Sequence, residues 1–449
     1  MKARVLVAVV LASAVFCLVA NRFASQTSAA VSHSLTAPCV RGTFKSSRDV
    51  VPAGWTGLIF SLSQDYPDNQ PAPENYPWET IDFKTSPEDY LLAVRAYLFA
   101  GNLTSGDPNA PWVIENNTTR KWYHAPWLDA GRNGREFIHG LTRELASVPG
   151  QLWKNPPQNK DIQNWAVGFY NAPGASVLGK VWCDPQNPTM TPVVFPEGTV
   201  SAKLLFSAAS NEQVPFLKNS VQWTANINTV ETDPQSPRSP KAVRLLQIDL
   251  AVRDSRASET GWVFGTLIYD PNFTTTNPWE RMRPVGLMWG NDPSATPTNG
   301  QPINQTWLNP SVASLMQHYG WAERLNGPVD NPLSSCLSCH SVAGWPLKAL
   351  TPPSSANDVE RLHWFRNIQA GEPFEPNQTS FDYSLQLMYG IRQFKAEHPG
   401  GPVPLVQPSV SHAPLPEVNR AGSSSDKEFR RDVLRELQNR RRRKSHRTH

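Results

Sequence analysis

Val243-Arg-Leu-Leu-Gln-Ile-Asp-Leu-Ala-Val252 is the stretch that decides the fold class of this 449-residue chain. One set of alternate positions is apolar after Arg244, whereas the other set carries Gln247 and Asp249. Such alternation is typical of a strand that turns one face toward a core. The stretch therefore predicts a β-rich centre.

Six further runs of strand-like composition lie around this stretch, and Gly, Pro, Asn and Asp separate them. The runs are 165–170, 177–182, 200–206, 221–227, 262–269 and 285–289. Short strands broken by turn residues are typical of all-β architectures with antiparallel pairing. We therefore predict a central antiparallel β-sandwich or jelly-roll over residues 164–310.

Helical patterns lie on both sides of the β-rich region. Ser86 and Pro87 predict the start of a helix and Gly101 its end. Apolar residues at helical spacing predict further helices at 311–322, 356–368 and 381–397. The expected fold is α+β and multidomain, with an irregular or helical N-terminal region at 31–163 and a small, mainly helical domain at 311–400.

The pentapeptide Cys336-Leu-Ser-Cys-His340 carries the most specific chemistry in the chain. Two cysteines separated by two residues, with a histidine directly after the second cysteine, are the pattern for covalent attachment of c-type haem. A zinc site would need a second pair of ligands at usable spacing, but none of the other cysteines, Cys17, Cys39 and Cys183, belongs to a Cys-x-x-Cys or Cys-x-x-His pattern. A thioredoxin-like redox pair would follow a buried strand, whereas loop residues precede Cys336. The motif therefore favours one covalently bound haem c.

The context of the motif, Asn331-Pro-Leu-Ser-Ser-Cys-Leu-Ser-Cys-His-Ser-Val342, resembles the c-type cytochromes, and in particular bacterial cytochrome c family proteins of unassigned function. The resemblance implies that Cys336 and Cys339 form thioethers to one haem and that His340 is the proximal iron ligand. It also implies a small cytochrome c-like haem domain, which we place at 311–400. The resemblance covers about a fifth of the chain.

The sixth iron ligand is left open by the sequence. Small cytochromes commonly use a methionine downstream of the motif, and Met388 is the tentative distal ligand on this ground. Met388 also fits the apolar stripe of a predicted helix, where methionine belongs to the core. The alternatives are an open position, Met316, His318, His363, His124 and His139.

The N-terminus has the features of an export signal. Lys2 and Arg4 precede an apolar run at 5–20, and small residues near 28–30 offer a cleavage site. We therefore expect a signal peptide at 1–30 and a periplasmic or secreted protein. An uncleaved segment would instead attach the protein to a membrane. In an oxidising compartment Cys39 and Cys183 could form a disulfide, whereas Cys17 falls inside the apolar run.

The C-terminal part, 401–449, is predicted to be a Pro- and Ser-rich linker followed by a basic tail. Six positive charges lie between Arg440 and Arg447 with no acidic residue among them. A solvated tail accounts for this pattern, and nucleic-acid binding is not expected for an exported protein.

Three functions are compatible with these features. The favoured one is an exported mono-haem c-type cytochrome that transfers electrons to and from an unknown redox partner. The second is a haem-dependent oxidoreductase that acts on a small molecule at an open sixth position, with His124 and His139 in the pocket. The third is a glycan- or ligand-binding β-sandwich that uses Trp223 or Trp262 and carries an accessory haem module. No hydrolase or phosphate-binding motif is present.

Overall fold

The computed structural model describes residues 51–398, apart from 58, 60–61, 104–111, 113, 127–134, 156–157, 232 and 354. The predicted signal peptide, Cys17, Cys39 and the predicted linker and tail lie outside the described residues. The described residues all belong to one compact unit.

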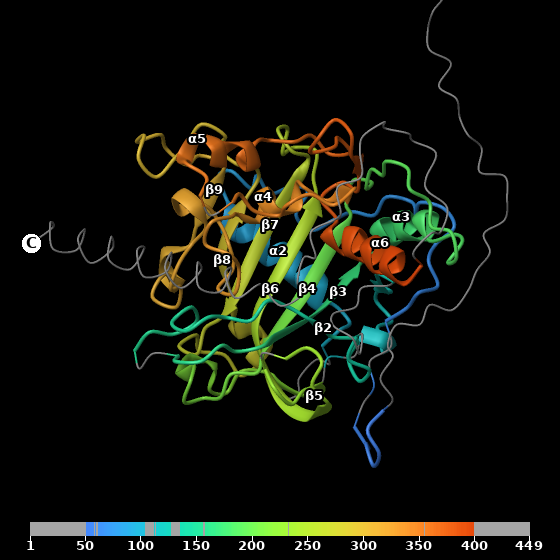
Figure 1. The fold of residues 1–449 in the computed structure, drawn as a ribbon, viewed down its shortest axis with the longest axis vertical. Coiled ribbons are helices and arrows are strands. Elements are labelled where there is room, and N and C mark those ends of the chain that lie inside the picture. The colour runs from blue at the N-terminus through green and yellow to red at the C-terminus, as the bar shows by residue number, and fades with distance from the viewer. Residues whose placement is uncertain are drawn as a thin grey trace, which may run out of the picture. The chain divides into compact units, whose positions relative to one another are not determined.

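Within this described part, five long strands make the centre of a nine-stranded antiparallel sheet (Figure 1). In spatial order they are β3 (Asn164–Tyr170), β4 (Val200–Ser207), β6 (Arg238–Arg253), β7 (Trp262–Tyr269) and β8 (Met282–Met288). Shorter strands complete the sheet: β1 (Tyr123–His124) and β2 (Thr142–Arg143) pair with β3, β5 (Gln222–Asn228) pairs with β6, and β9 (Thr306–Leu308) pairs with β8. The predicted β-rich α+β class is confirmed, and the stretch 243–252 lies inside β6.

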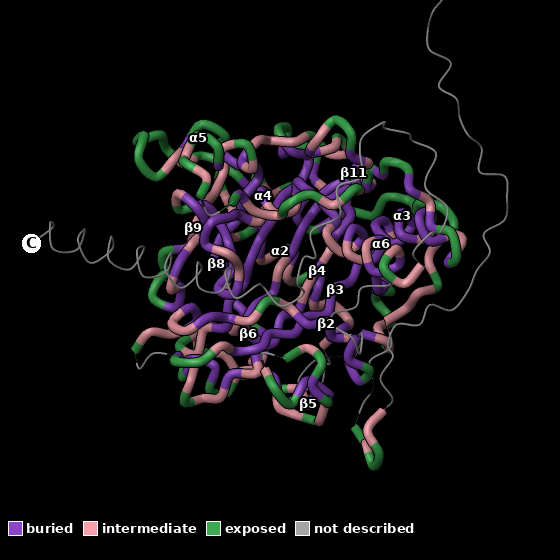
Figure 2. Tube along the Cα trace, in the orientation of Figure 1, coloured by how far each residue is buried: buried purple, intermediate pink, exposed green. Residues whose placement is uncertain are grey.

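Both faces of the central strands are covered by protein. Every residue of β7 is buried, which requires cover on each side of the sheet (Figure 2). On one face lies α2 (Pro87–Phe99), where Leu91 packs at Gly265. A Cβ at Gly265 would come within 2.5 Å of the Leu91 side chain, so glycine permits this close approach.

The opposite face carries the segment that contains the cysteine motif. Successive residues of a strand point to opposite faces, so Phe264 and Thr266 face away from α2. Against this second face lie α4 (Cys336–His340), near Thr266, and α6 (Leu385–Glu397), whose Gln386 packs at Gly168 (Figure 1). A two-stranded ribbon, β10 (Gly344–Trp345) with β11 (Thr379–Ser380), lies between these helices in sequence.

Two sequence predictions of secondary structure are wrong. The run 177–182 is not a strand, because α3 (Ala172–Val181) occupies it. Asn171 caps this helix through its side chain and Pro173 fits the first turn, and these signals outweigh the β-branched composition. The predicted helix at 311–322 is replaced by two short 3-10 turns, η4 (Pro310–Val312) and η5 (Trp321–Glu323), and Ala322 has a φ of +55°.

The other helix predictions hold with shorter bounds. The helix that starts after Ser86 is α2, and Gly101 follows it with a φ of +74°. The prediction at 356–368 corresponds to α5 (Asp358–Arg361) and η6 (Leu362–Phe365), and that at 381–397 corresponds to α6. Three further 3-10 turns are η1 (Ile114–Asn116), η2 (Pro215–Leu217) and η3 (Pro278–Arg281).

Candidate functional site

The motif forms a short helix, α4, whose start is fixed by serine side chains. Ser335 Oγ accepts a hydrogen bond from Ser338 N at 3.1 Å, and Ser338 Oγ accepts one from Ser335 N at 2.8 Å. This reciprocal capping box satisfies backbone N–H groups that have no partner inside the helix. Ser335 Oγ also donates to Asn291 Oδ1 at 2.9 Å, which attaches the helix start to the loop after β8.

The two cysteines and His340 lie on the same side of α4. Residues three and four apart in a helix share a face, so Cys336, Cys339 and His340 can point the same way. All three are partly exposed, whereas the intervening Leu337 and Ser338 are buried. The motif therefore turns its reactive atoms toward the sheet, where Cys336 Sγ lies 4.0 Å from Thr266 Oγ1 and the His340 ring packs on Phe264, and the three residues keep some exposure to solvent.

Both cysteines are free thiols. Burial of the thiols raises the pKa of Cys339 to about 12 and that of Cys336 well above its usual value, and nearby Asp330 acts in the same direction. Reactive or metal-binding cysteines usually have a lowered pKa. These surroundings keep both side chains as neutral thiols at neutral pH.

The imidazole of His340 is fixed by a backbone carbonyl. Its Nδ1 lies 2.8 Å from the oxygen of Tyr383, and because a carbonyl only accepts, Nδ1 carries the proton. Burial lowers the pKa of His340 to about 4, so the ring is neutral at neutral pH. The ring packs against Phe264 of β7 at a centroid distance of 4.7 Å. Nε2 therefore carries the lone pair, as in a metal-ligating histidine.

A row of polar side chains crosses the sheet beside the motif. Lys203, Asp249 and Thr266 are cross-strand partners on β4, β6 and β7. Lys203 Nζ lies 3.0 Å from Asp249 Oδ2, and Thr266 Oγ1 donates to Asp249 Oδ1 at 3.0 Å. Thr266 Oγ1 in turn lies 4.0 Å from Cys336 Sγ. Burial alone would lower the pKa of Lys203, but Asp249 and other carboxylates outweigh it and raise the pKa.

The side chains of the motif are of the types that a c-type haem requires. The described residues contain no group of three or more His, Cys, Asp or Glu side chains placed to hold a metal. Two neutral thiols and an imidazole with a free lone pair, all on one side of a helix, are what two thioethers and a proximal iron ligand require. Cys336, Cys339 and His340 are thus the residues that would hold the cofactor.

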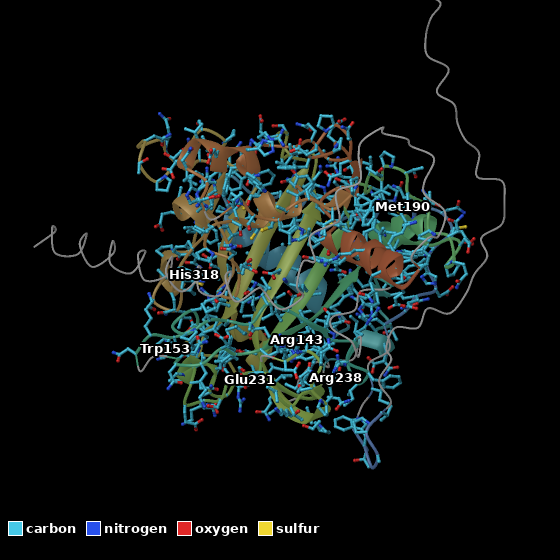
Figure 3. All side chains as sticks on the ribbon, viewed as in Figure 1. Arg143, Trp153, Met190, Glu231, Arg238 and His318 are labelled. Atoms are coloured by element: carbon cyan, nitrogen blue, oxygen red, sulfur yellow. The ribbon has the colours of Figure 1, made fainter. Side chains whose placement is uncertain are left out.

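The residues considered as sixth ligand have different surroundings. Met388 lies in the first turn of α6 and is fully buried in the apolar core, as is Met316 in the loop after η4. His318, which is labelled in Figure 3, is buried, and its Nδ1 lies 3.3 Å from Tyr319 O and its Nε2 3.1 Å from Pro328 O. His363 pairs with Glu375 at 2.7 Å near the surface. The ligand role of Met388 stays a prediction.

His124 and His139 belong to two separate buried contacts. The guanidinium group of Arg135 forms a hydrogen bond with the imidazole of His124. Burial of the imidazole, together with the positive charge of Arg135, lowers the pKa of His124 well below its usual value. His139 stacks on Trp223 at a centroid distance of 4.6 Å. Both contacts lie among residues of the N-terminal region and β5.

Of the two tryptophans proposed for ligand binding, one is buried and the other is partly buried. Trp262 is buried, and Trp223 lies between Phe206 and His139. A cavity of about 530 Å³ occurs instead near β9, where Trp289 and Trp307 are among the lining residues.

Sequence reasoning missed the residues that surround the motif, namely Lys203, Asp249, Thr266 and Tyr383. One signal was available for Asp249, because the alternation in 243–252 places it with Gln247 on the less apolar face. No local signal marks Tyr383, which lies 43 residues after His340.

Two further findings bear on location. Cys183 is disulfide-bonded, and Cys39, the partner predicted for it, lies outside the described residues. None of the helices in the described residues is long and apolar enough to span a bilayer.

Comparison with known proteins finds no matching family model, no matching curated protein and no matching solved structure.

Proposed function

We propose that this protein is an exported mono-haem c-type cytochrome that transfers electrons. The observation that carries the proposal is the joint arrangement of Cys336, Cys339 and His340. The thiols are free and partly exposed on one side of α4, and the His340 ring is held through Nδ1 so that Nε2 is left for iron. When bound, the haem supplies a one-electron couple at its iron.

The chain's own residues supply attachment and orientation. Cys336 and Cys339 anchor the porphyrin, and the capping box at Ser335 fixes the helix that presents them. Tyr383 O fixes the tautomer and the ring orientation of His340. The disulfide at Cys183 supports an oxidising compartment, where c-type haem is attached and disulfides persist.

The full chain, exported from a host with c-type haem maturation, tests the proposal. We expect a covalent haem, detected by a mass increase of one haem and by a haemochrome spectrum. Cys336→Ala with Cys339→Ala should abolish attachment, and His340→Ala should leave a thioether-linked haem with a perturbed spectrum. His398→Ala, which removes a histidine that stacks on Phe394 at the end of α6, is the matched control and should leave the spectrum unchanged. Covalent haem in the double cysteine variant would refute the assignment.

A haem-dependent oxidoreductase is the second candidate, because the Lys203–Asp249–Thr266 row supplies proton-bearing groups beside the motif. Carbon monoxide separates the two functions. Reduced bands that carbon monoxide leaves unchanged indicate a six-coordinate carrier, and bands that shift indicate an open site suited to a small-molecule substrate.

A further inference from the structure

The backbone just before α6 has an unusual conformation. Asp382 and Tyr383 have φ values of +45° and +65°, so two successive non-glycine residues are in the left-handed region. This region is costly for a bulky residue such as tyrosine and persists only where the surroundings impose it. The carbonyl that accepts from His340 Nδ1 belongs to this turn.

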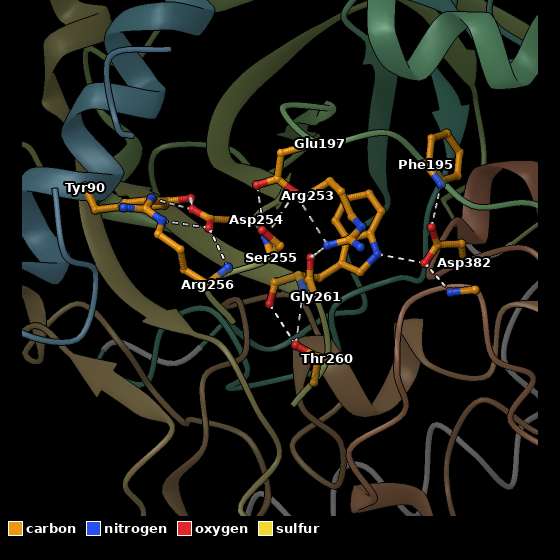
Figure 4. A network of polar contacts seen from close by, with 12 residues as sticks. Tyr90, Phe195, Glu197, Arg253, Asp254, Ser255, Arg256, Thr260, Gly261 and Asp382 are labelled. Carbon is orange, nitrogen blue, oxygen red and sulfur yellow. Dashed lines mark hydrogen bonds and ion pairs between the residues drawn. The ribbon is translucent and has the colours of Figure 1, made fainter. Parts of the chain in front are cut away.

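The side chain of Asp382 holds the turn in place. It is buried, and its oxygens accept from Phe195 N at 2.6 Å, Trp262 Nε1 at 2.9 Å and Gly371 N at 3.0 Å (Figure 4). The three donors come from the segment before β4, from the start of β7 and from the segment before β11. One carboxyl group therefore joins three parts of the chain, and all its partners are N–H groups.

Tyr383 is held by its own ring as well. Its hydroxyl donates to Ile368 O at 2.5 Å, and its ring lies 6.1 Å from that of Phe264, centroid to centroid. Phe264 is the residue on which the His340 ring packs. The Tyr383 carbonyl also accepts from Leu385 N at 3.2 Å, at the start of α6. Displacement of this turn would thus move the hydrogen-bond partner of His340.

We propose that Asp382 is a positioning residue for His340: it fixes the left-handed turn whose carbonyl orients the imidazole, and so sets the reduction potential of the haem iron. The inference rests on the proposed function. A histidine that donates through Nδ1 is a more basic ligand, and a more basic ligand favours the oxidised iron. Loosening this contact should therefore raise the midpoint potential.

Asp382→Asn is the decisive variant. Both carboxylate oxygens of Asp382 accept from N–H groups, and in asparagine an NH₂ donor would replace one of these two acceptors. Trp262→Phe removes the indole N–H that donates to Asp382 and leaves the Asp382 carboxyl group intact, so its effect should be milder. It also provides a second test if Asp382→Asn does not fold. The matched control is Asp254→Asn. Asp254 is equally buried and accepts from Tyr90 Oη at 2.9 Å and from Arg256 (Figure 4).

The measurements are the midpoint potential and the ferric electron paramagnetic resonance spectrum of the haem-loaded full chain. We expect a higher potential and altered g-values in Asp382→Asn, a smaller rise in Trp262→Phe, and a lower melting temperature with an unchanged potential in Asp254→Asn. Wild-type potentials in both Asp382→Asn and Trp262→Phe, with haem covalently bound, would overturn the positioning role. If Asp382→Asn does not accumulate, the potential of Trp262→Phe decides. A wild-type chain without haem would instead refute the proposed function.

Discussion

The hydroxyl of Thr266 in β7 donates a hydrogen bond of 3.0 Å to the carboxylate of Asp249 in β6. Thr266 Oγ1 is also 4.0 Å from Cys336 Sγ, so a single side chain connects a charged pair on the sheet to a proposed haem thioether. The other member of that pair is Lys203, at 3.0 Å from Asp249. Charges at this position should act on the iron, since both side chains are largely shielded from solvent.

Replacement of the two charges should shift the midpoint potential in opposite directions. Asp249→Asn removes a negative charge that favours the oxidised iron, so the potential should rise, whereas Lys203→Gln should lower it. The double variant should lie between the two. Glu88→Gln, which removes a carboxylate paired with Arg283 on the α2 side, is the control and should have no effect. Shifts of the same sign in both single variants would contradict the electrostatic account.

The Ser335 cap should contribute to the stability of the motif helix. Ser335→Ala removes the acceptor for Ser338 N and the bond to Asn291, and loss of a helix cap costs about 0.5–2 kcal/mol. Chemical denaturation of the haem-free chain measures this cost. Ser311→Ala, at an exposed serine, should change stability by less than about 0.5 kcal/mol. Equal stability of Ser335→Ala and the wild type would show that the cap is dispensable.

His124 should make folding weaker in mild acid. Its folded-state pKa lies well below 6.5, because the ring is buried and next to Arg135. Above pH 6.5 His124 is neutral in both the folded and the unfolded chain, so it does not reduce the free energy of unfolding. Below pH 6.5 the unfolded chain binds a proton that the folded chain excludes, so the free energy of unfolding should fall by about 1.4 kcal/mol per pH unit.

His124→Gln should remove this component of the slope, whatever it does to stability at neutral pH. Urea denaturation of the haem-free chain between pH 7 and 5, at about half-unit steps, gives both slopes. His363→Gln serves as the control, because His363 lies near the surface. The interpretation fails if wild type and His124→Gln lose stability equally as the pH falls.

The sequence predicts the parts of the fold that local periodicity encodes. Alternation identifies β6, and the Ser86, Pro87 and Gly101 signals identify α2. The error at α3 has a local cause, since Val177 and Val181 suggest a strand while Asn171 directs a helix. Periodicity does not predict which strands pair with each other, because the alternation within a strand indicates only which of its faces is buried. That β3 to β8 share one sheet had to come from the structure.

The candidate site divides in the same way. Cys336, Cys339 and His340 are recognisable because their chemistry requires a fixed local spacing. Asp249 and Tyr383 reach the motif through sheet pairing and through a turn 43 residues downstream, so no window of sequence contains the contact. Asp382 falls inside the helix predicted at 381–397, and only its left-handed backbone and its three N–H partners reveal its position in the core.

Met388→Leu tests the one ligand assignment that rests on sequence alone. Met388 is fully buried in α6, and a change from methionine to leucine conserves volume, so it should cost less than about 1.5 kcal/mol. If the sulfur of Met388 binds iron, as its place downstream of the motif predicts, the variant should lose the absorption bands of methionine-ligated haem and show a lower midpoint potential. Met316→Leu, at a second buried methionine, is the matched control and should keep both properties. A Met388→Leu variant with the wild-type spectrum and potential would assign Met388 to the core, and the sixth position would then be open or belong to another residue.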